Sequence, residues 1–222
     1  MITENKDSLQ LWCTQVQLND ELEQGFLSAS ELTRFHRIKR KRKKQEYLMS
    51  RALMRTACSS YFNIASNTLL FIEKPHALPM ISPLPKGYYY SLSHSKGLIY
   101  FAISNNPIGI DVEQHLHRTD IIGAAEFFMS ANELKNLMSL KSTALNYFYR
   151  LWCAKEAYFK SVPPSQQQHI SLQAIDYHSL CDNNINATLF EKELQHHQLA
   201  VFCRKHYSNF TINTLTREQF VI

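Results

Sequence analysis

A short segment near the start of the chain, LSASEL at Leu27–Leu32, returns near its middle as MSANEL at Met129–Leu134. Both contain Ser-x-x-Glu, the capping box in which a serine and a glutamate satisfy the first free N–H groups of a helix. Apolar residues at three- and four-residue spacing follow each copy, which predicts a long helical segment behind it. The repeated layout predicts two copies of one α+β unit.

Strand patterns follow the helical segments. Tyr88–Ser104 is typical of two aromatic-rich strands around a turn at Ser95–Gly97. Further strands are predicted at Leu199–Cys203 and Phe210–Leu215. The fold class is therefore α+β. The turn at Asn105–Pro107 divides the chain into an expected N-terminal half, residues 1–106, and C-terminal half, residues 107–222.

Composition indicates a folded chain with an ordinary core. The 222 residues are 45% hydrophobic and 19% charged, and no apolar stretch is long enough to span a membrane. We expect no secretory signal in the first residues, MITENKDSLQ. The five cysteines are scattered without metal-type spacing and are expected to be reduced thiols. These features predict a cytoplasmic protein with no membrane partner.

The net charge of +5 comes from one place. The segment Arg34–Lys44, RFHRIKRKRKK, holds eight of the 24 lysines and arginines, which leaves the rest of the chain slightly acidic. Such a run favours a polyanionic partner: nucleic acid, the phosphates of a cofactor or an acidic protein. A solvated helix face is the alternative.

The stretch PIGIDVEQ, Pro107–Gln114, predicts a strand with one apolar face. Asp111 and Glu113 share the other face, with Cα atoms roughly 6.6 Å apart, where their charges repel. They could form the solvated face of an antiparallel strand. A divalent cation between the two carboxylates is the alternative interpretation.

A helix is predicted at Leu151–Lys160, LWCAKEAYFK, with Glu156 and Lys160 one turn apart on one face. They could simply form an exposed ion pair. Together with Asp111 and Glu113, however, Glu156 completes a set of three carboxylates, which suits Mg²⁺ rather than zinc. Mg²⁺ fills its shell with waters and substrate phosphates, and Lys160 could contact such a phosphate.

The segment SLSHSKG, Ser91–Gly97, holds His94 among serines at the start of a predicted turn. The histidine and the hydroxyls could donate hydrogen bonds to a phosphate. A solvated histidine in a hairpin turn is the alternative.

Four motifs in this order resemble the surfactin-type 4′-phosphopantetheinyl transferases, over roughly Phe26 to Lys160. They are SRALMR at Ser50–Arg55, SLSHS, IGIDVEQ and WCAKEAYFK. The resemblance implies two similar α+β halves related by a pseudo-twofold, with the site in the cleft between them. It also implies a monomer whose partners are coenzyme A (CoA) and an apo acyl or peptidyl carrier protein. The phosphopantetheine arm of CoA would move to a serine of the carrier, releasing adenosine 3′,5′-bisphosphate.

The resemblance also implies roles for individual residues. Asp111, Glu113 and Glu156 would hold Mg²⁺ against the CoA pyrophosphate, and Lys160, with Lys155, would neutralise the charge that develops there. His94 would contact the 3′-phosphate of CoA beside basic residues of the first half, with Arg51 the leading candidate. Such a transfer needs positioning and charge neutralisation, and Glu156 or a metal-bound water would take the serine proton.

One departure from the family pattern stands at Glu73-Lys74-Pro75, where the family often has Gly-Lys-Pro. The glutamate adds bulk and negative charge near the expected cofactor pocket, and it puts the role of Lys74 in CoA binding in question. The rival interpretation is a metal-dependent nuclease or a basic nucleic-acid-binding protein. It is disfavoured because Glu113 is not followed by the x-Lys of a common nuclease motif, and because aromatic residues do not alternate with the basic run.

Overall fold

The computed structural model describes residues 8–17, 22–74, 78–117, 119–182 and 186–222. Its helices and short 3₁₀ turns are α1 (Ala29–Arg37), α2 (Lys41–Phe62), η1 (Ser66–Thr68), α3 (Ile121–Glu126), α4 (Ala131–Ser139), α5 (Ala144–Ser161), α6 (Pro164–Gln167), η2 (Leu172–Ala174), α7 (Tyr177–Leu180) and η3 (Arg217–Gln219). Its strands are β1 (Ser8–Gln15), β2 (Leu70–Ile72), β3 (Met80–Ser82), β4 (Tyr89–Ser95), β5 (Leu98–Ser104), β6 (Ile108–Gln114), β7 (Thr188–Leu194), β8 (His197–Cys203) and β9 (Asn209–Thr214). The predicted α+β class is confirmed.

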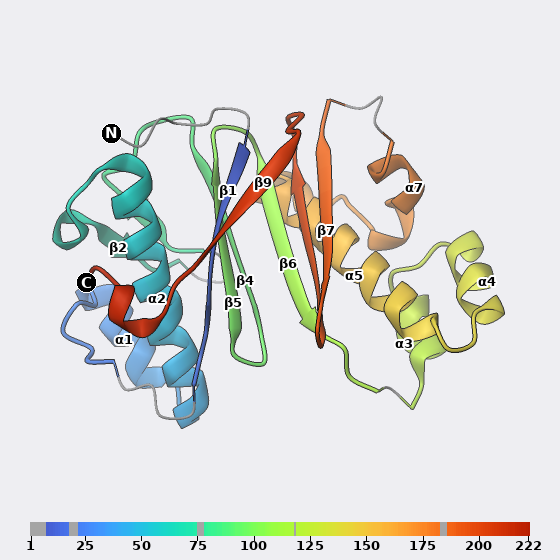
Figure 1. Ribbon diagram of the computed structural model, residues 1–222, viewed down its shortest axis with the longest axis horizontal. Coiled ribbons are helices and arrows are strands. Elements are labelled where there is room, and N and C mark those ends of the chain that lie inside the picture. The colour runs from blue at the N-terminus through green and yellow to red at the C-terminus, as the bar shows by residue number, and fades with distance from the viewer. Residues whose placement is uncertain (1–7, 18–21, 75–77, 118, 183–185) are drawn as a thin grey trace.

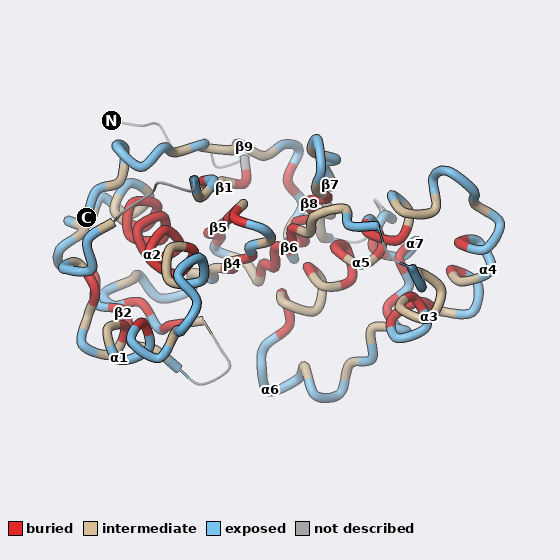
Figure 2. Tube along the Cα trace, turned by 90° about the horizontal axis from the view of Figure 1, so that it is seen from below, coloured by how far each residue is buried: buried red, intermediate tan, exposed pale blue. Residues whose placement is uncertain are grey.

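Two sheets stack between two long helices (Figure 1). One sheet has the order β4-β5-β1-β9, the other has the order β6-β8-β7, and β2 pairs separately with β3. Apolar side chains of β1 and β5, among them Leu11, pack against Ile110 and Val201 of the second sheet. Helix α2 covers the outer face of the first sheet and α5 covers the outer face of the second. Figure 2 shows the buried residues running through these four layers.

Both predicted capping boxes are present. Ser28 and Glu31 cap α1, and Ser130 and Glu133 cap α4, each by reciprocal hydrogen bonds between side chain and backbone. Each expected long helical segment is nevertheless two helices, α1 with α2 and α4 with α5. The first break falls within the basic run, where a continuous helix would place like charges one turn apart.

The predicted hairpin and the predicted strands at Pro107–Gln114 and near the end of the chain are all present, as β4, β5, β6, β8 and β9. The last strand has an unexpected position. β9 pairs in parallel with β1, with Ser8 opposite Asn209 and Cys13 opposite Thr214. The sheet of the first half is therefore completed by residues that follow the expected boundary between the halves.

No helix in the described part of the chain is both long enough and apolar enough to cross a membrane.

Candidate active site

Alternate serines of β4 join it to the edge of β6. The hydroxyls of Ser91, Ser93 and Ser95 accept hydrogen bonds from every second backbone N–H of β6, at 3.1, 3.2 and 3.1 Å. β8 pairs with the other edge of β6. These hydroxyls, expected to face a phosphate, thus bind the backbone where the two sheets meet.

Asp111 lies at the centre of this junction and is 3% exposed. Its Oδ1 accepts a hydrogen bond from the Ser93 hydroxyl at 2.9 Å and pairs with the Lys160 ammonium at 2.6 Å. Its Oδ2 is buried and has no hydrogen-bond partner within the described ranges. A buried carboxylate oxygen without a partner is costly, so this atom favours a cation or another donor beside it.

Glu113 and Glu156 approach Asp111 from two elements. Glu113 follows on β6 and accepts a hydrogen bond from the Ser95 hydroxyl at 2.8 Å. Glu156 is half-buried on α5, and three neighbouring charges affect its pKa: those of Lys160, Asp111 and Glu113. Burial raises the pKa of Glu156, Lys160 lowers it, and the negative charges of Asp111 and Glu113 raise it, so that the pKa lies above the ordinary value.

The four charged groups from PIGIDVEQ and LWCAKEAYFK act on one another: Lys160 contacts Asp111, and the charges of Lys160, Asp111 and Glu113 all shift the pKa of Glu156. They do not form a finished cage: among the described residues, no three His, Cys, Asp or Glu side chains are gathered closely enough to hold a metal ion. The positive charge beside Asp111 is the Lys160 ammonium. The donors still fit Mg²⁺, because all are oxygens, Oδ2 of Asp111 lacks a partner, and Mg²⁺ typically takes only one or two carboxylates with waters and phosphates.

Gly109 allows α5 to reach these carboxylates. A Cβ atom at Gly109 would collide with the backbone carbonyl of Ala157 and the backbone N–H of Ser161. The missing side chain therefore lets α5 lie directly on β6, which brings Glu156 and Lys160 over Asp111. Sequence reasoning treated this glycine only as part of the motif.

His94 lies in strand β4 itself, just before the turn, and its side chain is 43% exposed. Its Nδ1 is 4.0 Å from Oε2 of Glu46 on α2. Burial lowers the pKa of His94, and the positive charges of Lys43, Lys160 and Arg51 outweigh the opposite effect of Glu46. The imidazole of His94 is therefore neutral and lies near several positive charges.

Lys155 does not join the site. Its ammonium is fully buried and donates to Glu133 at 2.6 Å and to the carbonyl oxygens of Phe128 and Leu172. Burial lowers the pKa of Lys155, while its hydrogen bond to Glu133 acts in the opposite direction. The expectation that Lys155 neutralises a phosphate is corrected: it holds the capping glutamate of α4, as Arg55 holds Glu31 of α1.

Arg51 is also engaged inside the protein. It is 4% exposed, stacks on the Tyr47 ring at 4.5 Å, and forms ion pairs with Glu73 and Glu31. The expectation that Arg51 is open to a CoA phosphate is therefore corrected, because its guanidinium already faces two carboxylates. Lys74, the other basic candidate of this region, is exposed directly after Glu73.

The basic run divides between two helices. Arg34 and Arg37 lie on α1, whereas Lys41 to Lys44 form the first turn of α2. Arg42 donates to the carbonyl of Lys96 in the β4–β5 turn at 3.1 Å, and Lys43 pairs with Glu46. The run thus lies beside the strand that carries His94.

One family model and several known proteins are similar to this chain. The family model described as the 4′-phosphopantetheinyl transferase superfamily matches residues 107–213, which include all three carboxylates. The chain is 27% identical to the 4′-phosphopantetheinyl transferase ffp of Bacillus subtilis, over 71% of this chain and 75% of that protein. It is 26% identical, with the same coverage, to the 4′-phosphopantetheinyl transferase Sfp of B. subtilis strain 168. A putative 4′-phosphopantetheinyl transferase of Synechocystis is 29% identical over 62% of this chain and 57% of that protein.

The family match thus covers the half that carries Asp111, Glu113, Glu156 and Lys160, and the relatives extend the similarity into the half that carries His94. Over these residues the chain is similar to the 4′-phosphopantetheinyl transferase superfamily.

Proposed function

We propose that this enzyme transfers 4′-phosphopantetheine from CoA to a serine hydroxyl of an apo acyl or peptidyl carrier protein. The serine oxygen forms a bond to the phosphorus of the phosphopantetheine, the bond to the bridging pyrophosphate oxygen breaks, and adenosine 3′,5′-bisphosphate leaves. The observation that supports the proposal is the contact of Lys160 with Asp111 at the junction of the two sheets, with Glu156 close enough for both charges to shift its pKa. Their charges suit a pyrophosphate held with a divalent cation.

Asp111, Glu113 and Glu156 are the residues that would hold Mg²⁺. When bound, this ion would neutralise phosphate charge and strengthen the electrophilic character of the phosphorus. The chain supplies the rest of the chemistry. Lys160 stabilises the charge that grows on the leaving oxygen, and Glu156, whose pKa is raised, is suited to accept the proton of the serine.

His94 and the basic residues beside it bind the nucleotide end of CoA. The imidazole donates a hydrogen bond to a phosphate oxygen, and Lys74 and the exposed cations of α1 and α2 attract the polyanion. Lys155 and Arg51 are not included, because Lys155 is ion-paired with Glu133 and Arg51 with Glu31 and Glu73. We also propose that the protein acts as a monomer in the cytoplasm.

The direct test is incubation of the protein with CoA, Mg²⁺ and purified apo carrier proteins of the acyl and peptidyl types. The expected result is a carrier heavier by one phosphopantetheine group, in amounts that depend on Mg²⁺, with release of adenosine 3′,5′-bisphosphate. A carrier of unchanged mass in every combination, together with cleavage of DNA or RNA by the same preparation, would support the nuclease interpretation instead.

A further inference from the structure

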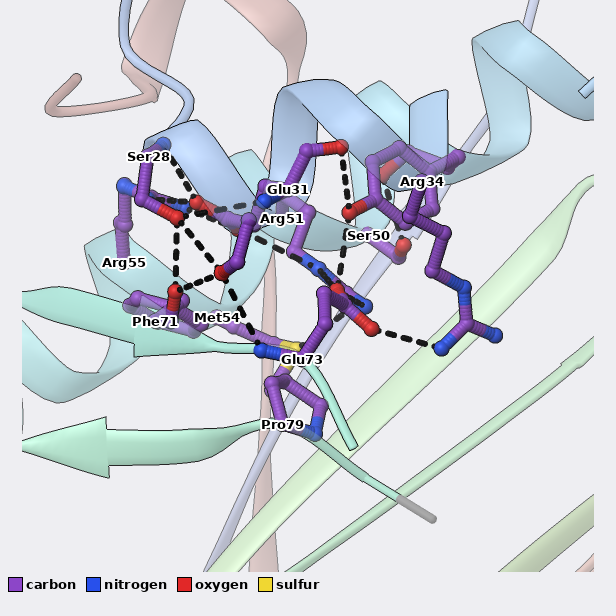
Figure 3. A network of polar contacts seen from close by, with 12 residues as sticks. Ser28, Glu31, Arg34, Ser50, Arg51, Met54, Arg55, Phe71, Glu73 and Pro79 are labelled. Carbon is purple, nitrogen blue, oxygen red and sulfur yellow. Dashed lines mark hydrogen bonds and ion pairs between the residues drawn. The ribbon is translucent and has the colours of Figure 1, made fainter. Parts of the chain in front are cut away.

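Figure 3 shows the carboxylate of Glu73 beside Arg34 and Arg51, and the Tyr47 hydroxyl completes this cradle. Its Oε2 accepts a hydrogen bond from Arg34 at 2.6 Å, and its Oε1 accepts from the Tyr47 hydroxyl at 2.8 Å and from two nitrogens of Arg51, at 3.1 and 2.5 Å. The backbone N–H of Glu73 donates to the Ser30 hydroxyl at 3.2 Å, which fixes where its side chain begins. Both carboxylate oxygens are therefore held by the protein.

The donors of this cradle are those that proteins use for phosphate. Arginine forks and a hydroxyl bind a carboxylate and a phosphate group with nearly the same geometry. Burial acts to raise the pKa of Glu73, but the charge and hydrogen bonds of Arg51, with those of Tyr47 and Arg34, hold the pKa below its ordinary value. The ionised carboxylate of Glu73 therefore occupies the position at which the cradle would otherwise bind an anion from solution.

The charge balance of the surrounding network points the same way. Arg51 and Arg55 also contact Glu31, so that three arginines face two glutamates and the network carries one net positive charge. Without the charge of Glu73, the network would carry two net positive charges, and Arg34, whose side chain is 49% exposed, would open it to solvent. A second anion would then be needed to satisfy the cradle.

Electrostatic effects on His94 connect the cradle with the proposed donor site. His94 is close enough to Arg51 on one side and to Lys160 on the other that both positive charges lower its pKa. Lys160 in turn contacts Asp111 at 2.6 Å. A CoA molecule whose pyrophosphate lies at the carboxylates and whose nucleotide passes His94 would direct its terminal phosphate towards the cradle.

We propose that Glu73 supplies from within the protein the negative charge that the 3′-phosphate of CoA would otherwise bring to Arg34 and Arg51. This inference rests on the proposed function and concerns the donor. An enzyme whose cradle is already filled gains little from the 3′-phosphate, so it uses 3′-dephospho-CoA almost as well as CoA. Glu73 is then a specificity-determining residue that makes the donor requirement broader.

The experiment compares kcat/KM for CoA with kcat/KM for 3′-dephospho-CoA, with one apo carrier and saturating Mg²⁺. The wild type is expected to prefer CoA by less than about 3-fold, which is under 1 kcal/mol. Glu73→Gln keeps the shape of the side chain and removes the charge, and it should raise the preference for CoA at least about 10-fold, as one charge-assisted phosphate contact warrants. Adding Arg34→Gln to Glu73→Gln should cancel most of that gain.

Two controls make the result decisive. Glu126→Gln removes the same charge from an exposed position on α3 and should leave the preference as in the wild type. If Glu73→Gln fails to fold, as judged by thermal unfolding, Glu73→Asp replaces it. The aspartate keeps the charge but withdraws the carboxylate by one methylene, so the preference should rise by an intermediate factor.

The outcomes also separate this inference from the proposed function. A wild type that transfers phosphopantetheine but prefers CoA by about 10-fold or more, with Glu73→Gln unchanged, overturns the role of Glu73 and leaves the transferase proposal standing. No transfer from either donor to any carrier overturns the proposed function itself. A preference that rises equally in Glu73→Gln and Glu126→Gln also overturns the inference, because a general change in charge would then explain it.

Discussion

The Lys160 ammonium lies 2.6 Å from Oδ1 of Asp111 and ties the last turn of α5 to the middle of β6. An i,i+4 pair with Glu156 was one alternative for this lysine, and such a pair would contribute little. Its actual partner is a buried carboxylate on another element, and its charge still lowers the pKa of the half-buried Glu156. The Lys160 cation thus contacts one of the three acids and acts electrostatically on a second, Glu156.

The first prediction concerns the metal. Asp111→Asn and Glu156→Gln should each reduce transfer by about 10²-fold or more, since each removes a negative charge that would hold Mg²⁺. Mg²⁺ should raise the unfolding temperature of the wild type, because a ligand that binds the native state stabilises it. Neither variant should show that rise in a thermal unfolding assay. Full activity of both variants at limiting Mg²⁺ would exclude the site.

The second prediction concerns pH and Glu156. Its pKa is raised above the ordinary value of 4.5, so its proton is bound more tightly in the folded state. The tighter binding of this proton stabilises the folded state. The stabilisation is fully present below the ordinary pKa and is lost as pH rises through the raised pKa. Without Mg²⁺, Glu156→Gln should therefore unfold at a higher temperature than the wild type near about pH 8, and the difference should shrink near about pH 4. Equal stabilities of the variant and the wild type at both pH values would show that burial and the nearby acids do not raise the pKa of Glu156.

The third prediction separates Lys160 from His94. In the proposed function, Lys160 acts on charge that develops during the reaction, so Lys160→Ala should chiefly lower kcat, by about 10²–10³-fold. His94 would contact the nucleotide end in the ground state and the transition state alike, so His94→Ala should chiefly raise KM for CoA. Steady-state kinetics measure both, and Lys135→Ala on the exposed face of α4 is the matched control. A reversed pattern would exchange the two assignments.

The fourth prediction concerns the contact of α5 with β6. Gly109→Ala should push α5 away from β6, because the new methyl group meets the backbone of Ala157. Overpacking of this kind costs about 1–3 kcal/mol, and the loss of activity should exceed the loss of folded protein because Glu156 moves too. Circular dichroism and transfer assays on the same sample measure the two effects. Gly25→Ala is the control, since nothing lies within 4 Å of its added Cβ, and it should behave as the wild type.

The fifth prediction concerns Lys155. Lys155→Met leaves the buried Glu133 without its cation, which should cost about 3–5 kcal/mol of unfolding free energy. Denaturant unfolding measures this loss, and Lys135→Met, at an exposed lysine, should show almost none. The part of the Lys155→Met protein that remains folded should keep the KM of the wild type for CoA. A raised KM with unchanged stability would restore Lys155 to the phosphate site.

Local pattern explains what the sequence could predict. The capping boxes, the β4–β5 hairpin and the alternation in PIGIDVEQ depend on neighbours within a few residues, and all three are present. Strands β1, β2, β3 and β7 were not predicted. β2 and β3 have three residues each, too few for a clear period, and β7 mixes polar with apolar positions. In β1, Leu9 and Leu11 do alternate with polar residues, so its period of two could have indicated a strand.

The faces on which the acids and Lys160 lie could be predicted from the sequence, whereas the partners of Lys155 and Arg51 could not. Asp111, Glu113 and Glu156 lie on regular elements whose faces follow from spacing. Whether a lysine or arginine is free depends on distant partners: Glu133 for Lys155, and Glu73 for Arg51. The serines at alternate positions of β4 had a visible period of two, and that period could have indicated their common contact with β6.

The parallel pairing of β1 with β9 bears on how the protein reaches its native state. Ser8 and Asn209 must meet across almost the whole chain, and contacts of such long range form late and slow folding. Until they form, one edge of β1 is open, and an open strand edge invites association with other chains. The two halves should therefore unfold together in a single cooperative transition, and a fragment ending at residue 106 should aggregate rather than fold.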